Sequence, residues 1–206
     1  MKKRYDVIVV GGGPGGSWAA KNAAEQGLSV LLLEKDREIG VPVRCGEGIL
    51  ESFLSRLVSI RRGWIAREIT KAQVIAPDGT EVDLNFEDRS VILNRRIFDR
   101  DLAGIASDAG AEIRTRAYVH GLIVDKDSVA GVRVNEMGYE REIFSSVVIG
   151  ADGIESRVGR WGGIKTSLSP EGLMHCAQMT LSIIETVSSC PQLSFSSPVN
   201  PVAILR

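Results

Sequence analysis

The chain has 206 residues, of which 25 are basic, 26 are acidic and 44% are hydrophobic. The balanced charge argues against a nucleic-acid-binding protein, and no apolar run is long enough to span a bilayer. Three cysteines without C-x-x-C spacing and only two histidines argue against a metal site and for a reduced, cytoplasmic setting.

The first predicted element is a buried parallel strand at 5–10, which runs directly into a glycine-rich loop. Gly11, Gly13 and Gly16 have the G-x-G-x-x-G spacing that opens a dinucleotide-binding βαβ unit. In that motif the first glycine allows a tight turn, the second lets backbone approach the pyrophosphate, and the third lets the helix pack closely on the strand. The start of the next helix then offers N–H groups and a positive dipole end to the phosphates.

That helix is predicted to end near Gln26, because Gly27 is a natural stop, and a second strand is expected at 28–33. Glu34 lies at the tip of the second strand, where a carboxylate can accept hydrogen bonds from both ribose hydroxyls. A carboxylate there disfavours a 2′-phosphate. The sequence therefore predicts bound NAD or FAD rather than NADP.

After Glu34 the chain departs from a simple NAD-binding domain. The elements expected next are a loop at 35–48, a helix at 49–58, hairpin strands at 72–76 and 81–86 around a Pro-Asp-Gly turn, and a short third strand at 91–93.

The second half returns to α/β order. Apolar residues at helical spacing predict a helix between Asn94, a plausible N-cap, and Gly110. The elements expected after it are strands at 111–117, 121–124, 129–134 and 140–150, the middle two forming a hairpin. The segment 181–206 is almost free of charge, and its structure is left unassigned.

Several motifs follow one another in an order that is itself informative. They are VVGGGPGGSWAA at 9–20 with Glu34, GVPVRCGEG at 40–48, Arg95-x-x-Phe98-Asp99, and Gly150-Ala151-Asp152-Gly153-x-x-Ser156. Over about 5–179 the set closely resembles the geranylgeranyl reductase family of FAD-dependent enzymes, especially the archaeal digeranylgeranylglycerophospholipid reductases. The P-x-x-C-G-E-G loop is its most specific part, whereas the glycine loop and the Asp-Gly pair are shared with flavin hydroxylases.

The resemblance implies an α/β fold: a glutathione-reductase-type, Rossmann-like FAD-binding domain with a parallel sheet and a β-meander, plus part of an interrupted β-rich substrate domain. The FAD-binding domain is assigned to 1–48 and 91–180. The inserted substrate-domain segment is assigned to 49–90, and 181–206 stays an unassigned tail.

The resemblance also implies a function: FAD-dependent reduction of isoprenoid carbon–carbon double bonds in geranylgeranyl lipids. The expected partners are a polyprenyl lipid, an electron donor that is either NAD(P)H or ferredoxin, and a membrane surface at which the protein is peripheral. One alternative is an FAD-dependent monooxygenase, which would not need Cys45. The other is a non-catalytic remnant, because family members continue well beyond 206 residues, so this chain is expected to be a truncated form without activity of its own.

The FAD contacts implied by the resemblance lie in four places. They are Gly11, Gly13, Gly15, Gly16 and Glu34 on the adenosine side, Cys45, Gly46 and Gly48 near the flavin, Arg95 and the backbone of Val119, and Asp152 with Gly153 in the second dinucleotide motif. Cys45 is the candidate catalytic residue, and an inert packing role is the alternative.

Three further residues have competing interpretations. Glu47 is favoured as a carboxylate at the start of the helix expected at 49–58. Arg95 lies at a helix start, where a cation opposes the dipole and therefore predicts an anionic partner, the pyrophosphate. Trp18 replaces a small residue of the family; if it points inward, the helix cannot approach the sheet closely.

Overall fold

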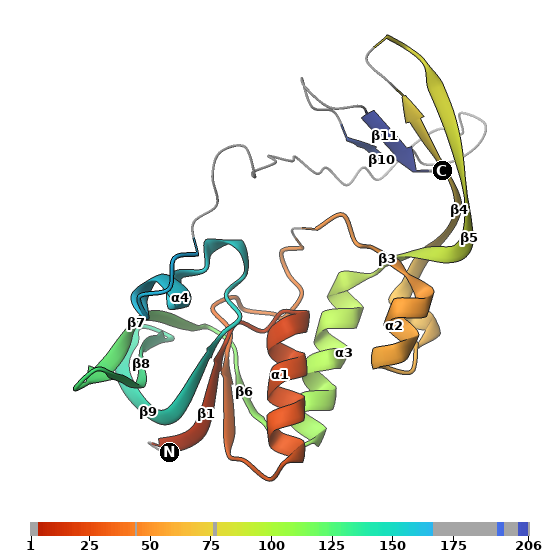
Figure 1. Ribbon diagram of the computed structural model, residues 1–206. Helices are drawn as coiled ribbons and strands as arrows, with labels where there is room; N and C mark the ends of the chain where they lie inside the picture. Colours follow the sequence, from red (N-terminus) through yellow and green to blue (C-terminus); the bar gives the residue numbers. More distant parts are fainter. Residues whose placement is uncertain (1–3, 44, 76–77, 167–192, 196–201, 206) are drawn as a thin grey trace. The chain divides into compact units, whose positions relative to one another are not determined.

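The computed structural model describes residues 4–43, 45–75, 78–166, 193–195 and 202–205 (Figure 1). These residues divide into two compact units. The first holds 4–43 and 95–166, and the second holds 45–75, 78–94, 193–195 and 202–205. The second unit is thus inserted into the first after Val43, and the chain returns at Arg95. The sequence-based domain limits remain predictions.

The described part of the first unit contains one mixed sheet in the order β6-β2-β1-β9-β8-β7. Its parallel part consists of β1 (Arg4–Val10), β2 (Val30–Leu33), β6 (Glu112–Arg114) and β9 (Tyr139–Gly150). The strands β7 (Ala117–Asp125) and β8 (Ser128–Glu136) complete an antiparallel meander with β9. The predicted returning strand at 140–150 is therefore confirmed, and it lies beside β1.

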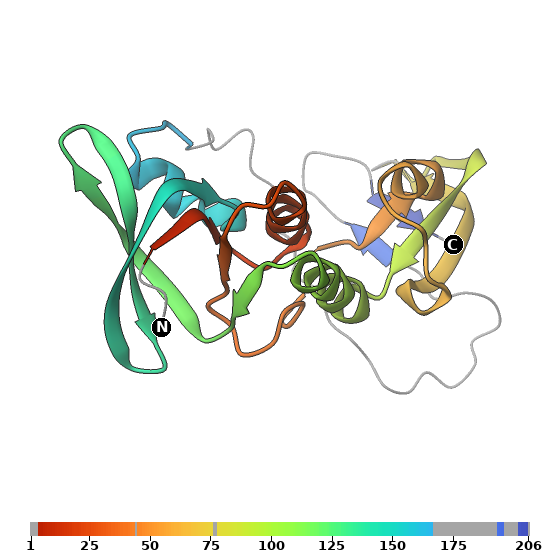
Figure 2. The same ribbon diagram turned by 90° about the horizontal axis from the view of Figure 1, so that it is seen from below.

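Helices α1 (Pro14–Glu25) and α3 (Arg95–Asp108) lie side by side on one face of the parallel strands (Figures 1 and 2). A short 3-10 turn, η2 (Gly153–Glu155), and helix α4 (Arg157–Trp161) follow β9. Alternate residues of each parallel strand face opposite sides, as the period of a strand requires.

The core of the first unit consequently has two parts. On the helix side, Val7, Val9, Val30 and Leu32 pack with alanines of α1 and α3. On the other side, the meander supplies the partners of the intervening strand residues; this cluster contains Ile8, Val10, Leu31, Leu33, Ala117, Val119, Leu122, Val132, Val134 and Ile143. Each such buried aliphatic side chain contributes roughly 1.5–3 kcal/mol, so this packing fixes where β1, β2 and β9 end.

The described part of the second unit is built on an antiparallel sheet in the order β10-β11-β4-β5-β3. Its elements are β3 (Gly48–Leu50), α2 (Glu51–Leu57), the 3-10 turn η1 (Arg62–Trp64), β4 (Ile65–Ile75), β5 (Glu81–Leu93), β10 (Leu193–Phe195) and β11 (Val202–Leu205). The last two strands come from the tail that the sequence left unassigned.

Three sequence-based boundaries are wrong. The strand expected at 91–93 is the end of β5, because Val91 and Ile92 pair with β3 and β4 in one continuous strand. The strand expected at 111–117 is two strands, since Arg116 has a φ of +54° and turns the chain from β6 into β7. The helix expected at 49–58 starts at Glu51, because Gly48–Leu50 pairs with β5.

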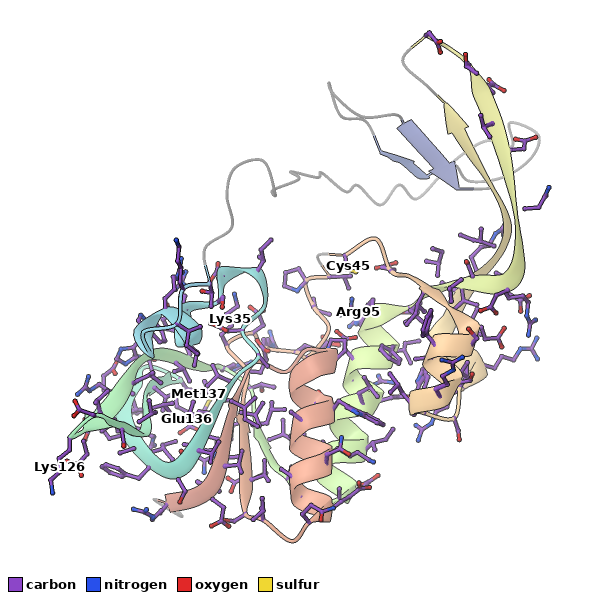
Figure 3. All side chains as sticks on the ribbon, viewed as in Figure 1. Lys35, Cys45, Arg95, Lys126, Glu136 and Met137 are labelled. Carbon is purple, nitrogen blue, oxygen red and sulfur yellow. The ribbon has the colours of Figure 1, made fainter. Side chains whose placement is uncertain are left out.

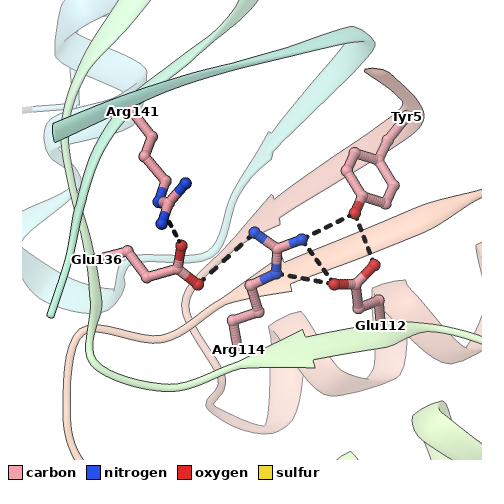
Figure 4. A network of polar contacts seen from close by, with 5 residues as sticks. All are labelled: Tyr5, Glu112, Arg114, Glu136 and Arg141. Carbon is pink, nitrogen blue, oxygen red and sulfur yellow. Dashed lines mark hydrogen bonds and ion pairs between the residues drawn. The ribbon is translucent and has the colours of Figure 1, made fainter. Parts of the chain in front are cut away.

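A polar network joins β1, β6, β8 and β9 (Figure 4). The Tyr5 hydroxyl donates to Glu112 Oε2 over 2.6 Å, and Arg114 Nη2 donates to Glu112 Oε1 over 2.6 Å and to the Tyr5 oxygen over 3.1 Å. Glu136 then links Arg114, at 3.6 Å, to Arg141, at 3.0 Å. Burial, reinforced by the hydrogen bond to Glu112, raises the pKa of Tyr5 to about 12.

Candidate functional site

The loop after β1 contains glycines that the packing of the protein itself requires. Gly11 has a φ of +107°, and a Cβ there would lie 2.2 Å from the Ala151 carbonyl oxygen. A Cβ on Gly16 would lie 1.9 Å from the Gly11 carbonyl oxygen. These two positions fix a tight turn and a close approach of α1 to the strand, as the sequence motif predicts.

At two other positions of the loop, Gly13 and Gly15, the packing of the described protein does not require a glycine. A Cβ on Gly13 or Gly15 would meet no heavy atom of the described protein within 4 Å. Both lie at the N-terminus of α1, where Pro14 carries no N–H and no described side chain caps the helix. This open cradle with helix N–H groups and a positive dipole end fits the pyrophosphate of a dinucleotide.

Glu34 holds the glycine loop against the end of β2. Its Oε2 accepts a hydrogen bond from Gly12 N over 2.6 Å, and its Oε1 accepts one from Asp36 N over 2.9 Å. The sequence motif alone did not predict these bonds, because they depend on how the loop folds back over the strand. The contact of Glu34 with a ribose stays a prediction.

The Asp152-Gly153 pair lies beside the glycine loop. Gly150 is in register with Val10, and the Ala151 N–H donates to the Val10 carbonyl, so the ends of β9 and β1 are neighbours. Asp152 Oδ2 accepts a hydrogen bond from Val158 N over 2.9 Å at the start of α4. The structure therefore brings together the glycine loop and Asp152 at one edge of the sheet, while their contacts with FAD stay predictions.

Arg95 begins α3, and its partner was missed by the sequence reasoning. Its Nε and Nη2 donate to the two carboxylate oxygens of Asp99 over 2.7 and 2.8 Å. Asp99 lies four residues on, so the spacing of helix ion pairs was the signal that could have found it. This carboxylate supplies an anionic partner close to the helix start, and the pyrophosphate contact of Arg95 remains a prediction.

Val119 lies in β7, where it is buried and pairs with Val134 of β8. The register shifts between Val119 and Gly121, which is typical of a β-bulge. Its predicted backbone contact with FAD stays a prediction.

Trp18 points away from the sheet, which is the outward orientation considered in the sequence analysis. The centre of its half-buried ring lies 4.7 Å from the Lys21 ammonium, while Ala20 and Ala24 face the sheet.

The Cys45 loop belongs to the second unit. Cys45 is an exposed, free thiol, and its sulfur accepts a hydrogen bond from Glu47 N over 3.4 Å (labelled in Figure 3). Glu47 has a φ of +63° and precedes β3 rather than a helix, so the interpretation of Glu47 as a helix-start carboxylate is wrong. The flavin contacts of Cys45, Gly46 and Gly48 stay predictions.

The sequence matches the FAD binding domain family over residues 4–195. The chain belongs to this family. The prediction of FAD as the cofactor is thereby confirmed, as is a Rossmann-like α/β fold. No helix among the described residues is long and apolar enough to cross a membrane.

Individual relatives narrow the comparison. A digeranylgeranylglycerophospholipid reductase of Methanosarcina mazei is 47% identical over 186 residues, which cover 88% of this chain and 46% of that protein. The crystal structure of a geranylgeranyl bacteriochlorophyll reductase-like protein from Thermoplasma acidophilum is 39% identical with a TM-score of 0.76, covering 82% of this chain and 44% of that one. The resemblance predicted from the sequence motifs is confirmed.

A flavin-dependent brominase shares the fold alone, at 24% identity and a TM-score of 0.65, over 77% of this chain and 41% of that one. The chain spans about half the length of the curated relatives it matches.

Proposed function

We propose that this chain forms the FAD-binding part of an oxidoreductase that reduces isoprenoid carbon–carbon double bonds of geranylgeranyl lipids. The observation that carries the proposal is the 47% identity with a digeranylgeranylglycerophospholipid reductase, joined to a glycine loop whose open positions suit a pyrophosphate. The Cys45 loop supports the reductase over a monooxygenase, because hydroxylation would not need a thiol there.

When bound and reduced, FAD supplies a hydride to an alkene carbon, while a proton reaches the other carbon. The chain's own residues bind FAD and orient it. The start of α1 holds the pyrophosphate, and Glu34 keeps Gly12 and the β2 end in the shape that receives the adenosine. Asp152 anchors the start of α4 beside the loop. We further propose that Cys45 lies beside the flavin and the alkene, and that a polyprenyl lipid reaches the protein from a membrane surface.

The test expresses the gene's complete reading frame and, in parallel, residues 1–206. Each is reconstituted with FAD, reduced with dithionite without oxygen and given a detergent-solubilised geranylgeranyl glycerophospholipid; products are analysed by mass spectrometry. The complete frame should bind FAD non-covalently and add two hydrogens per double bond. Residues 1–206 should bind less FAD and show no turnover, because the relatives are about twice as long.

Two results would contradict the proposal. Retention of NADP instead of flavin would remove the cofactor assignment. Insertion of oxygen into the substrate when air is admitted, without saturation of any double bond, would favour the monooxygenase.

A further inference from the structure

Helix α2 of the second unit carries exposed apolar side chains. Phe53 is 55% exposed and Leu57 is 59% exposed. They are four residues apart, so they lie on one face of the helix. Leu54, in contrast, is buried and attaches the helix to its unit. Within the described residues, α2 therefore presents an apolar face that the unit itself does not cover.

The same segment is strongly basic. From Ser52 to Arg67 the sequence contains four arginines and no acidic residue, and all four arginines are exposed: Arg56, Arg61, Arg62 and Arg67. The Arg56 guanidinium lies 5.5 Å from the centre of the Phe53 ring, so charge and apolar surface adjoin on α2. The segment is thus an apolar face with a basic border.

Acidic residues also lie near this segment. Glu51 and Glu68, which flank the segment, both pair with Arg89, at 2.8 and 3.3 Å. Asp88 accepts a hydrogen bond from the Ser52 hydroxyl at the start of α2, whereas the exposed Glu81 and Asp83 lie toward the tip of the β4–β5 hairpin. Figure 1 shows α2 and that tip at opposite ends of the second unit. The segment 52–67 itself thus carries basic charges only, and the hairpin tip at the other end of the unit is acidic.

We propose that the α2–η1 surface, formed by Phe53, Arg56, Leu57, Arg61 and Arg62, docks on the anionic surface of a lipid bilayer. Arginines attract anionic headgroups, and aromatic and aliphatic side chains insert at the boundary between headgroups and acyl chains. The acidic hairpin tip at the far end of the unit would then point away from the negative surface. The choice of a bilayer rests on the proposed function, whose substrate is a glycerophospholipid.

The full chain is tested by co-sedimentation with vesicles of phosphatidylcholine alone and of phosphatidylcholine with phosphatidylglycerol. Binding should require phosphatidylglycerol and weaken as salt rises, because the attraction is screened. The double variant Arg56→Glu with Arg62→Glu should bind the anionic vesicles about tenfold or more weakly. Phe53→Ser with Leu57→Ser should weaken binding at both low and high salt.

Matched controls lie in the first unit. Arg100→Glu reverses an exposed charge on α3, and Met137→Ser removes a large side chain that is 66% exposed at the β8–β9 turn (labelled in Figure 3). Both should bind vesicles like the unaltered chain, and circular dichroism should show that all variants are folded. Equal losses in the controls and the α2 variants would overturn the proposal.

Two further outcomes would also overturn it. One is binding to phosphatidylcholine vesicles that is as strong as binding to anionic ones. The other is a dimer in sedimentation equilibrium that Phe53→Ser with Leu57→Ser converts to a monomer without any lipid binding, which would assign the face to a second copy. Vesicle binding needs neither FAD nor turnover, and the reductase assay uses detergent-solubilised lipid, so each proposal can fail without the other.

Discussion

The glycine loop and the Cys45 loop are both predicted to contact FAD, yet they are built differently. In the glycine loop, Gly11 and Gly16 approach other backbone atoms so closely that a side chain cannot fit. Glu34 holds the loop with a 2.6 Å hydrogen bond. In the Cys45 loop, the thiol is exposed, and its sulfur accepts a local hydrogen bond from Glu47 N.

The difference indicates how each loop obtains its shape. The glycine loop is fixed by the same packing that holds β1, α1 and β9 together, so it is organised before any ligand arrives. The Cys45 loop has a local turn, but its described contacts do not bury the thiol. Preorganisation lowers the entropy that binding must offset. We therefore expect the first loop to supply affinity for FAD and the second to supply reactivity.

The largest effect should come from replacing Gly16. Gly16→Ala places a Cβ 1.9 Å from a backbone oxygen, so α1 must move, and we expect a loss of stability of about 3 kcal/mol or more. Gly15→Ala is the matched control: its Cβ would meet nothing, and alanine favours a helix by roughly 0.5–1 kcal/mol. Urea unfolding and FAD titration check the pair.

Gly15→Ala should therefore keep or gain stability while binding FAD more weakly, because the methyl group would occupy the cradle. Unchanged FAD affinity in Gly15→Ala would show that the open position at Gly15 does not receive the pyrophosphate. The glycine loop would then not be the source of affinity for FAD.

Next in size is the Glu34 carboxylate. Glu34→Gln removes the charged acceptor of the Gly12 and Asp36 N–H groups, which should weaken FAD binding by ~1–3 kcal/mol. Glu38→Gln, which alters an exposed pair with Arg96, should change binding and stability by less than about 1 kcal/mol. Isothermal titration with FAD measures both, and equal effects of the two variants would contradict the role assigned to Glu34.

The polar network around Tyr5, Glu112 and Arg114 is not expected to contact a ligand. It therefore shows how much a hydrogen bond with a purely structural role contributes to stability. Tyr5→Phe should cost about 1–2 kcal/mol of stability at neutral pH, with FAD affinity unchanged. The pKa of Tyr5 is raised to about 12, so the folded state keeps the phenol proton that the unfolded chain loses near pH 10. Stability should hence fall as pH rises from about 10 to about 12, and Tyr5→Phe should lack that part of the loss.

The network also predicts a loss of folding stability at acidic pH. Burial acts to raise the pKa of Glu112, but the hydrogen bonds from Tyr5 and Arg114, with the Arg114 charge, outweigh it and lower the pKa below the usual 4.5. Its contribution is present above pH 4.5 and disappears as pH falls through the lowered value. Urea unfolding of the parent and of Tyr5→Phe across both pH ranges would measure these two losses of stability. Identical dependence of stability on pH in the two proteins would contradict the role assigned to the network.

The smallest effect on stability is expected at Cys45. Because the thiol is exposed, Cys45→Ala should change unfolding free energy by no more than about 0.5 kcal/mol. In the complete reading frame it should lower turnover much more than FAD content. The thiol should also react readily with a disulfide reagent in the folded chain, and bound FAD should slow that reaction. Parallel losses of flavin and turnover would assign Cys45 to packing. The Cys45 loop would then have no role in reactivity.

The sequence by itself determined the elements whose signals are local. The strand before Gly11, the helix that ends at Gly27 and the hairpin around residue 126 follow from hydrophobic period and turn residues. The glycine spacing and Glu34 were sufficient to predict a dinucleotide site for NAD or FAD, because each of those residue types has a physical task at that position. The choice of FAD came from the resemblance carried by the later motifs.

Tertiary structure decided the features that depend on residues far apart in the chain. Arg116 turns the chain between β6 and β7 because its N–H bonds to Asp36 and the next N–H, of Ala117, bonds to Glu34. Gly48–Leu50 became a strand because β5 offered an edge to pair with. The Gly12–Glu34 bond likewise exists only once the loop lies over β2. Backbone hydrogen bonds between distant segments have no local pattern, so only the folded chain could assign these partners.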